Sequence, residues 1–289
     1  MLKNSDEGTY FKQNMSIKVR HKLLEFTDNV VMGILNVTSD SFYDKSRVTS
    51  ESDILNKAEK MLIEGADILD IGGYSSRPGA SEVPLIVEIE RISSATKLIR
   101  KNFPDAILSL DTFRSEVAKA GLDEGIDMIN DISAGNLDQE LPKIVAEYDV
   151  PYIIMHMRGN PKTMSDLTNY ENLMKDLIFY FSQKINSFRE IGIKDIIIDP
   201  GFGFSKTVEQ NFEIIQHFSM LQILDCPILA GISRKSFIQN KLNVSMENSL
   251  VGTNVLHTLL LQKGANILRT HDVAEAKQCI SLLKASSYS

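Results

Sequence analysis

The sequence predicts an α/β protein that folds as a single (β/α)8 (TIM) barrel. Three observations support this prediction: eight short apolar runs recur along the chain, segments with helical periodicity separate them, and polar side chains follow every run. Uninterrupted apolar runs are typical of strands that are buried on both faces in a parallel sheet. The 289 residues are enough for one barrel, which typically needs about 250 residues.

The apolar runs begin at residue 30 and recur about every 33 residues, which is the length of one β-α unit. We expect strands at residues 30–35, 68–71, 107–110, 128–129, 152–155, 196–198, 228–230 and 267–268. Eight units can close a ring, and the sequence contains no ninth unit. An open, doubly wound sheet is the alternative architecture for the same alternation of strands and helices.

The segments between these runs have the spacing of amphipathic helices. We expect one helix over residues 52–64 and a long helix over residues 167–191. The long helix has one apolar stripe, formed by Leu173, Leu177, Phe181, Ile185 and Phe188. Gly65 and Gly264 follow helical segments and are expected to end them.

A short N-terminal extension precedes the barrel. Apolar and polar residues alternate over residues 16–20, and a second short apolar segment follows at residues 23–26, so we expect a hairpin there. Residues 1–15 have no periodicity, and we expect a disordered tail. The predicted domains are therefore the tail at 1–15 and the barrel domain at 16–285.

Composition excludes several classes of protein. The net charge of −7 leaves no basic face that could bind nucleic acid by neutralising phosphates. No apolar run approaches the roughly 18 residues of a membrane span, and the first 25 residues lack the apolar core of a signal peptide. Cys226 and Cys279 lie in apolar surroundings, so we expect buried, reduced thiols and a cytoplasmic location.

Polar side chains stand at the end of every predicted strand, and in a barrel the active site lies at the carboxyl ends of the strands. Any one of these residues could instead cap the following helix. The complete set indicates a binding cavity. Its members are Asn36, Asp70, Asp111, Asn130, Asp131, His156, Asp199, Ser233, Arg234, Lys235, Arg269, His271 and Asp272.

These side chains divide by chemistry. Asp111, Asn130 and Asp199 supply mainly acceptors, which suit a flat heterocycle that presents several N–H groups, and Lys235 supplies a donor to a ring oxygen or nitrogen. A cationic set suits a phosphate or diphosphate, and its members are Arg77, Arg269 and His271. Asn36 offers a neutral oxygen for Mg²⁺, a metal that proteins commonly share with substrate phosphates.

Two loops after the first two strands, residues 37–47 and 72–80, are rich in small polar residues. Loops at this end of a barrel often carry function, which favours a lid over an ordinary surface loop. His156 could act as an acid or base, but a structural hydrogen-bonding role is the stronger expectation.

Seven motifs in this order resemble those of the dihydropteroate synthase family, over roughly residues 30–280. They are Met-Gly-Ile-Leu-Asn-Val-Thr at 32–38, Asp-Ile-Gly-Gly at 70–73 with Ser-Arg-Pro-Gly-Ala at 76–80, Asp-Thr at 111–112, Ile-Asn-Asp at 129–131, Asp-Pro-Gly-Phe-Gly-Phe at 199–204, Ser-Arg-Lys-Ser at 233–236 and Arg-Thr-His-Asp at 269–272. Met-His-Met at 155–157 also matches. Ser39, Lys45, Ser46, Tyr74 and Ser76 depart from the usual pattern, mainly in the first two loops.

The resemblance implies a transferase of folate biosynthesis that joins 6-hydroxymethyl-7,8-dihydropterin diphosphate to p-aminobenzoate. It implies Asp111, Asn130, Met155, Asp199 and Lys235 around the pterin. It implies Mg²⁺ at Asn36, and Arg77, Arg269 and His271 on the diphosphate. It implies Ser76, Phe204 and Ser236 at the p-aminobenzoate site. Asp111, Lys235, Arg269 and His271 are the expected catalytic residues.

The physics of the reaction agrees with this assignment. Loss of diphosphate favours a cation-like transition state, which the carboxylates can offset while cations and Mg²⁺ stabilise the leaving group. No insertion stands beside Phe204, so we expect a sulfonamide-sensitive enzyme.

The sequence leaves two alternative functions open, and it leaves the oligomeric state open. A methyltetrahydrofolate-binding barrel that serves a corrinoid protein would share the ring-binding residues but would not need a diphosphate set. A non-catalytic pterin-binding paralogue would bind without turnover. Family members are commonly homodimers, and residues 251–261 are apolar enough for a dimer contact, although packing against the barrel would explain them equally well.

Overall fold

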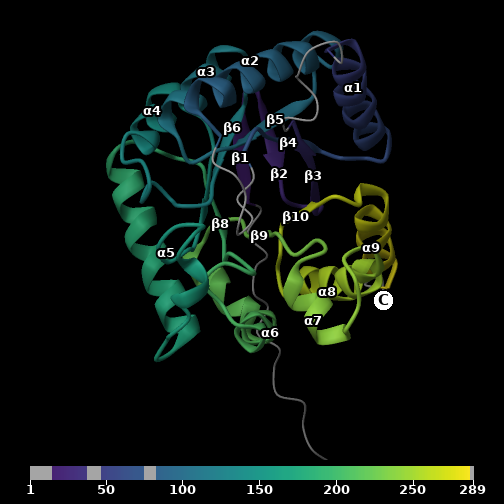
Figure 1. Ribbon diagram of the computed structural model, residues 1–289. Helices are drawn as coiled ribbons and strands as arrows, with labels where there is room; N and C mark the ends of the chain where they lie inside the picture. Colours follow the sequence, from purple (N-terminus) through teal and green to yellow (C-terminus); the bar gives the residue numbers. More distant parts are fainter. Residues whose placement is uncertain (1–14, 38–46, 75–82, 287–289) are drawn as a thin grey trace, which may run out of the picture.

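The protein forms a closed barrel of eight parallel strands surrounded by helices (Figure 1). The computed structural model describes residues 15–37, 47–74 and 83–286. The barrel strands are β3 (Val30–Asn36), β4 (Ile68–Gly72), β5 (Ile107–Asp111), β6 (Met128–Asp131), β7 (Tyr152–Met155), β8 (Ile196–Asp199), β9 (Leu229–Ala230) and β10 (Ile267–Thr270). All eight predicted strands are therefore confirmed.

The ring closes between β8 and β9. Neighbouring strands are hydrogen-bonded in the order β8-β7-β6-β5-β4-β3-β10-β9. A parallel bridge joins Ile198 to Ile228, and the Ile198 amide donates to the carbonyl oxygen of Pro227 at 3.0 Å. The open, doubly wound alternative is wrong, because sequential strands pair all the way around and the last gap is bridged.

Helices cover the outside of the barrel. They are α1 (Arg47–Ile63), α2 (Leu85–Asn102), α3 (Ser115–Asp123), α4 (Leu141–Tyr148), α5 (Leu173–Glu190), α6 (Val208–His217), α7 (Ser236–Leu242), α8 (Leu250–Gln262) and α9 (Val273–Ser286). Short 3-10 turns lie at Met164–Asp166, Phe218–Leu224 and Glu247–Ser249. No helix in the described ranges is long and apolar enough to cross a membrane.

Local sequence signals explain most helix ends, with two corrections, both at helix starts. Helix α1 begins at Arg47, five residues before the start expected at residue 52. Gly65 and Gly264 have φ of +97° and +98°, so they end α1 and α8 in the left-handed conformation that glycine favours. The predicted helix over 167–191 is wrong at its start. Helix α5 begins at Leu173, because the Asn172 side chain accepts from the Lys175 amide and caps it there. Its predicted apolar stripe is buried.

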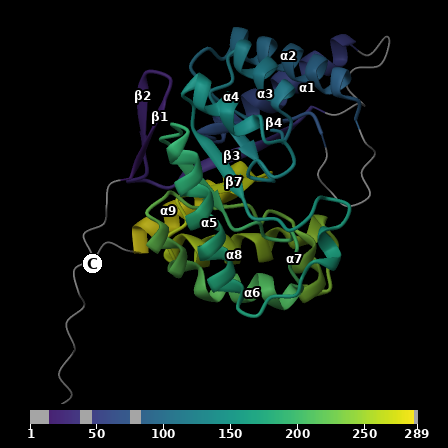
Figure 2. The same cartoon turned by 90° about the vertical axis from the view of Figure 1, so that its left-hand side faces the viewer.

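The N-terminal hairpin closes one end of the barrel. It consists of β1 (Ser16–Val19) and β2 (Lys22–Glu25), which pair antiparallel beside the barrel (Figure 2). Ile17, Val19 and Phe26 pack against the first residues of the strands, including Val30 and Ile267, in one buried apolar cluster. The hairpin therefore covers the amino-terminal end of the barrel and leaves the carboxyl ends of the strands uncovered by it.

The sequence also leads us to expect a disordered tail at residues 1–15 and two buried, reduced cysteines. The predicted tail at 1–15 lies outside the described residues, apart from Met15, whose carbonyl oxygen accepts from the Phe26 amide at 2.9 Å. Cys226 and Cys279 are buried and form no disulfide, as expected.

The hairpin plug gives a stability prediction. Ile17 is 2% exposed at the barrel end, so Ile17→Ala should lower the free energy of unfolding by about 2–5 kcal/mol through lost burial and a residual cavity. Leu23→Ala in the same hairpin is the matched control, because Leu23 is 65% exposed, and it should cost no more than about 0.5 kcal/mol. Urea unfolding measures both values, and equal effects would contradict the plug.

Candidate active site

Arg269 lies at the centre of the carboxyl end of the barrel and bridges two carboxylates. Its Nε lies 2.6 Å from Asp70 Oδ2, and its Nη2 lies 2.6 Å from Asp111 Oδ2. Asn130 Nδ2 donates to Asp70 Oδ2 at 3.0 Å. Four strands, β4, β5, β6 and β10, thus contribute to one hydrogen-bonded cluster.

Parallel pairing explains why these residues meet. In the register of the sheet, Asp111 on β5 pairs with Gly72 on β4 and with Asn130 on β6. Gly72 leaves room, because a Cβ there would lie 3.4 Å from Asn36 Oδ1 and 3.8 Å from Asp111 Cβ. The Asn36 amide oxygen therefore lies close to the carboxylate cluster, at the exposed end of β3.

Burial sets the charge states in this cluster. Desolvation raises the pKa of Asp111 to about 7; Arg269 opposes the shift, and nearby carboxylates, Asp70 first among them, add to it. The two carboxylates raise the pKa of the Arg269 guanidinium. Asp70 is fully buried, and its Oδ1 has no hydrogen-bond partner. An unpaired buried oxygen of this kind is costly, which is consistent with a functional cluster.

Asp199 and Lys235 form the second part of the site. Asp199 Oδ1 accepts from the Gly201 amide at 2.8 Å, and burial raises the pKa of the Asp199 carboxyl, while Lys235 is the main group that lowers it. Burial lowers the pKa of Lys235 to about 8. Lys235 Nζ donates to the carbonyl oxygen of Phe202 and lies 4.7 Å from the centre of the Phe204 ring.

Apolar side chains line the same end of the barrel. Met155, the last residue of β7, is opposite Asp199 in the sheet register. It is buried in a cluster with Ile132, Met157 and Met164, against which Phe204 packs. A flat ring could therefore meet carboxylate and amide groups at its edge and apolar groups on its face.

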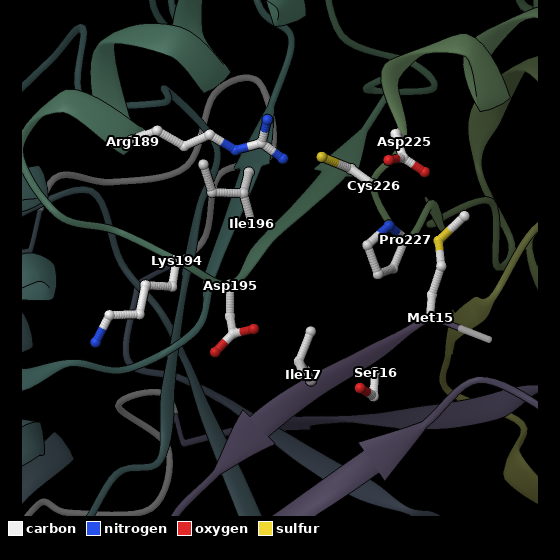
Figure 3. Close-up of a pocket in the computed structure, with 10 residues that line it drawn as sticks. All are labelled: Met15, Ser16, Ile17, Arg189, Lys194, Asp195, Ile196, Asp225, Cys226 and Pro227. Carbon is white, nitrogen blue, oxygen red and sulfur yellow. The ribbon is translucent and has the colours of Figure 1, made fainter. Parts of the chain in front are cut away.

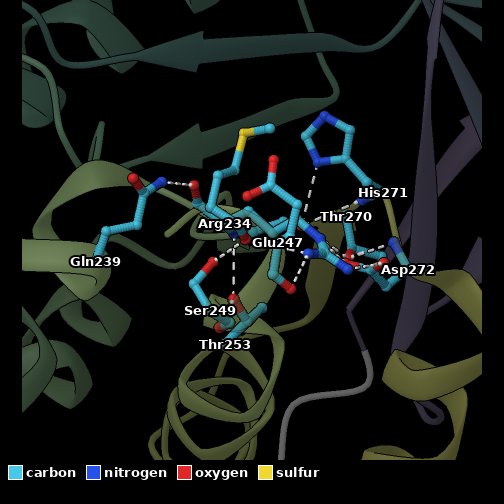
Figure 4. Close-up of polar contacts among 10 residues, drawn as sticks. Arg234, Gln239, Glu247, Ser249, Thr253, Thr270, His271 and Asp272 are labelled. Atoms are coloured by element: carbon cyan, nitrogen blue, oxygen red, sulfur yellow. Dashed lines mark hydrogen bonds and ion pairs between the residues drawn. The ribbon is translucent and has the colours of Figure 1, made fainter. Parts of the chain in front are cut away.

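His271 and Ser233 form the third part, beside an ion pair that shapes the loop (Figure 4). His271 Nδ1 lies 3.2 Å from Ser233 Oγ. Arg234 binds Asp272 through Nε and Nη2, each at 2.8 Å, and its Nη1 donates to the Glu247 carbonyl at 2.9 Å. Arg234 therefore fixes the loop that presents Lys235, and Ser236 is exposed at the start of α7.

His156 is a buried acceptor. Its Nδ1 lies 3.1 Å from Lys206 Nζ, and burial lowers the pKa of the His156 imidazole to about 2. A buried, neutral ring that accepts from Lys206 fits the structural hydrogen-bonding role expected for His156.

Sequence analysis assigned no role to two buried charged residues. Asp70 holds Arg269, and its signal is a carboxylate inside the apolar run of β4. Lys206 is buried behind the loop after β8, and its signal is a lysine directly after a tight glycine-containing loop.

Some predicted features fall outside the described residues. Ser76 and Arg77 do, as does most of both predicted lids, 37–47 and 72–80. Tyr74 is described, and its ring meets the Phe113 ring edge-on at 5.4 Å. The described ranges contain no cluster of three or more His, Cys, Asp or Glu side chains that could hold a metal.

A cavity of about 380 Å³ lies at the other end of the molecule, beside the hairpin (Figure 3). Its lining includes Ile17, Asp195 and Cys226. None of the predicted site residues lines it.

Comparisons with known proteins agree with the geometry. The family model described as "Pterin binding enzyme" matches residues 32–271. The dihydropteroate synthase of Synechocystis sp. is 40% identical over 258 residues, which cover 88% of this chain and 89% of the relative. The dihydropteroate synthase of Haemophilus influenzae is 36% identical over 275 residues, covering 94% and 99%.

Solved structures give the same result. A Yersinia pestis dihydropteroate synthase in complex with a sulfonamide drug superposes with a TM-score of 0.88 at 34% identity, covering 95% of this chain and all of that one. A Xanthomonas albilineans dihydropteroate synthase with 4-aminobenzoic acid gives 0.87 at 33% identity, covering 96% and 99%.

The raised pKa of Asp111 predicts a pH-dependent stability difference. The unfolded carboxyl ionises near pH 3.8 and the folded one near 7, so the folded state binds more protons between these values. The stability that Asp111 contributes is complete below about pH 3.8 and is lost as pH rises toward 7. The difference in unfolding free energy between wild type and Asp111→Asn should therefore fall from pH 4.5 to 7 and level off above.

Urea unfolding across that range measures the difference. A difference that is constant or rises with pH would show that burial does not dominate the Asp111 carboxyl.

Proposed function

Because this chain belongs to the pterin-binding enzyme family and, within it, to the dihydropteroate synthases, we propose that its strand ends divide into a pterin pocket, a diphosphate site and a p-aminobenzoate wall. The reaction is a transferase step of folate synthesis. It joins 6-hydroxymethyl-7,8-dihydropterin diphosphate to p-aminobenzoate and gives 7,8-dihydropteroate and diphosphate.

The pterin pocket contains Asp111, Asn130, Asp199 and Lys235, with Met155 against the ring face. The observation that carries this assignment is that Asp111 and Asn130 meet at the Arg269–Asp70 bridge, and that Asp199 and Lys235 interact with the Arg269 charge at the same barrel end. Asp199 offers a carboxylate to ring N–H groups, and Lys235 donates to a ring oxygen or nitrogen. The pocket thus offers hydrogen-bonding groups to the edge of a polar planar ring and an apolar side chain to its face.

The diphosphate site contains Arg269 and His271, together with Arg77. In the reaction the neutral aryl amine attacks the methylene carbon, the carbon–oxygen bond to diphosphate breaks, and the new C–N bond leaves a proton on nitrogen that is lost afterwards. No strong base is needed, because the aryl amine is neutral at pH 7. Asp111 and Asp199 offset the positive charge that spreads into the ring as the polyanion leaves.

Mg²⁺ is the proposed cofactor, and Asn36 is its protein ligand. The amide oxygen suits this hard cation, and its closeness to Gly72 and Asp111 places it at the edge of the pocket. When bound, Mg²⁺ would neutralise charge on the leaving diphosphate. The p-aminobenzoate wall is formed by Phe204 and Ser236, with Ser76.

Two further features complete the proposal. A cytoplasmic location is supported by the two buried, unbridged cysteines. A homodimer is supported by α8, which buries Leu256 and Leu260 on one face and exposes Val251 and Val255 on the other. The partners are then two small-molecule substrates and a second copy of the chain.

The first test of function is diphosphate release. Purified protein with the pterin diphosphate should release diphosphate and form dihydropteroate only when p-aminobenzoate and Mg²⁺ are both present. Tight pterin binding without turnover would instead identify a non-catalytic pterin-binding protein.

Substitution of Asn36 tests the metal assignment. Asn36→Ala removes the oxygen ligand and should raise the Mg²⁺ concentration for half-maximal rate about 10-fold or more. Asn36→Asp keeps an oxygen at this position and serves as the matched control. If Asn36→Ala has an unchanged Mg²⁺ requirement, Asn36 is not the ligand.

The p-aminobenzoate site predicts inhibition by sulfonamides, which resemble that substrate. Sulfamethoxazole should inhibit competitively with p-aminobenzoate in steady-state assays. Insensitivity at concentrations that block a known sensitive synthase would contradict this expectation.

The exposed stripe on α8 predicts the assembly. Val255 is 55% exposed, so Val255→Glu should convert a dimer into a monomer in analytical ultracentrifugation by placing a charge in an apolar interface. Phe179→Glu on α5, also at an exposed position, is the control and should leave the mass unchanged. A wild-type monomer would exclude the dimer.

A further inference from the structure

We propose that Lys206 and His156 are positioning residues that hold the Phe204 wall of the p-aminobenzoate site. Neither is expected to touch substrate. They act by fixing the backbone of the loop after β8, from which the Phe204 side chain projects. The inference rests on the proposed function, because it uses the assignment of Phe204 to the amine substrate.

The Lys206 ammonium is the centre of a buried hydrogen-bond cluster. Lys206 is 8% exposed. Its Nζ lies within hydrogen-bond distance of four acceptors: the carbonyl oxygens of Phe204 at 2.9 Å, Gly201 at 3.0 Å and His156 at 3.4 Å, and His156 Nδ1 at 3.1 Å. An ammonium has three N–H donors and no acceptor, so the three shortest contacts take one N–H each and Nδ1 of the imidazole is an acceptor. One side chain therefore joins the loop after β7 to the loop after β8.

The loop after β7 and the loop after β8 come into backbone contact at Gly201, where there is no space for a side chain. Gly201 has a φ of +72°, and a Cβ there would collide with the carbonyl oxygen of His156. The Gly201 carbonyl oxygen also accepts from the Phe204 amide at 3.1 Å, so it would keep one partner without the ammonium. The carbonyl oxygens of His156 and Phe204 would lose the Lys206 ammonium, and a buried carbonyl left unpaired costs about 1–3 kcal/mol.

Ser205 strengthens the same junction. Its Oγ accepts from the Arg158 amide and donates to the Arg158 carbonyl, both at 2.9 Å. The Tyr170 hydroxyl donates to the Ser205 carbonyl oxygen at 2.9 Å. The chain is therefore held at Ser205, next to Phe204, and the Lys206 ammonium is the group that binds the Phe204 carbonyl oxygen itself.

Phe204 is more dependent on Lys206 than Phe202 is. Phe202 is fully buried, its ring stacks with Phe218 and Phe237, and its carbonyl accepts from Lys235. Loss of the ammonium should consequently displace Phe204 and leave Phe202, with the pterin-side Lys235, largely in place. The effect is thus expected on the amine substrate and not on the pterin.

Burial and three neighbouring charged groups set the pKa of the Lys206 ammonium. Burial lowers the pKa of Lys206 to about 7; Asp199 on β8 opposes the shift, and Lys235 and Arg158 add to it. Burial also lowers the pKa of the His156 imidazole, which keeps Nδ1 available to accept from Lys206. The His156 ring therefore completes the cluster.

Steady-state kinetics with both substrates varied test the proposal. Lys206→Met and His156→Phe should each raise KM for p-aminobenzoate about 10-fold, which is the loss of one to two net hydrogen bonds, while KM for the pterin diphosphate changes less than about 2-fold. His156→Gln retains an acceptor for Lys206 and should stay near wild type in kcat and in both KM values. Lys263→Met removes a lysine–carbonyl bond to Gln216 at 3.0 Å elsewhere and should change neither KM.

Phe204→Ala in the same series separates this inference from the proposed function. If Phe204→Ala leaves KM for p-aminobenzoate unchanged, the assignment of the wall is wrong. If it raises that KM and Lys206→Met does not, the positioning role is wrong. A proportional rise of both KM values in Lys206→Met, or a rise of KM for p-aminobenzoate in His156→Gln as large as in His156→Phe, would also overturn it. If Lys206→Met does not fold, the two His156 variants decide.

Discussion

The bridge from Arg269 to Asp70 and Asp111 is the interaction on which the active end of this barrel depends. Three charged groups meet there, and burial imposes a desolvation cost on each that their mutual attraction helps to offset. The bridge joins strands β4, β5 and β10, which are far apart in sequence. It therefore fixes the side chains that we assign to the pterin pocket and the guanidinium that we assign to the leaving diphosphate.

The two ends of the barrel divide stability and function between them. At the amino-terminal end an apolar hairpin buries Ile17 and Val19 against the strand starts. At the carboxyl end charged and polar groups accumulate, and one buried oxygen among them, Asp70 Oδ1, has no hydrogen-bond partner. Apolar burial at the amino-terminal end stabilises the fold. That stability offsets the cost of the buried polar and charged groups at the carboxyl end.

Particular residues show how far sequence reasoning reaches. The strands, the hairpin and the polar strand ends could be predicted, because each is encoded by contiguous residues. The start of α5 could not be predicted, because the apolar spacing of the helix continues back to Leu167. In the structure the Asn172 side chain caps the helix, which therefore begins at Leu173. Nor could the partner of Arg269 be predicted: a cationic set suggested a phosphate site, and the structure pairs this guanidinium with two carboxylates.

The sequence by itself determined the alternation of eight strands with helices, the polar groups at the strand ends and the family motifs, because periodicity and spacing are local properties of the chain. Only the tertiary structure decided that the ring closes between Ile198 and Ile228, that Asp70 holds Arg269, and that Lys206 ties two loops together through His156. These contacts join residues that are distant in the chain. They depend on strand register, burial and the direction of buried carbonyls, none of which a linear pattern records.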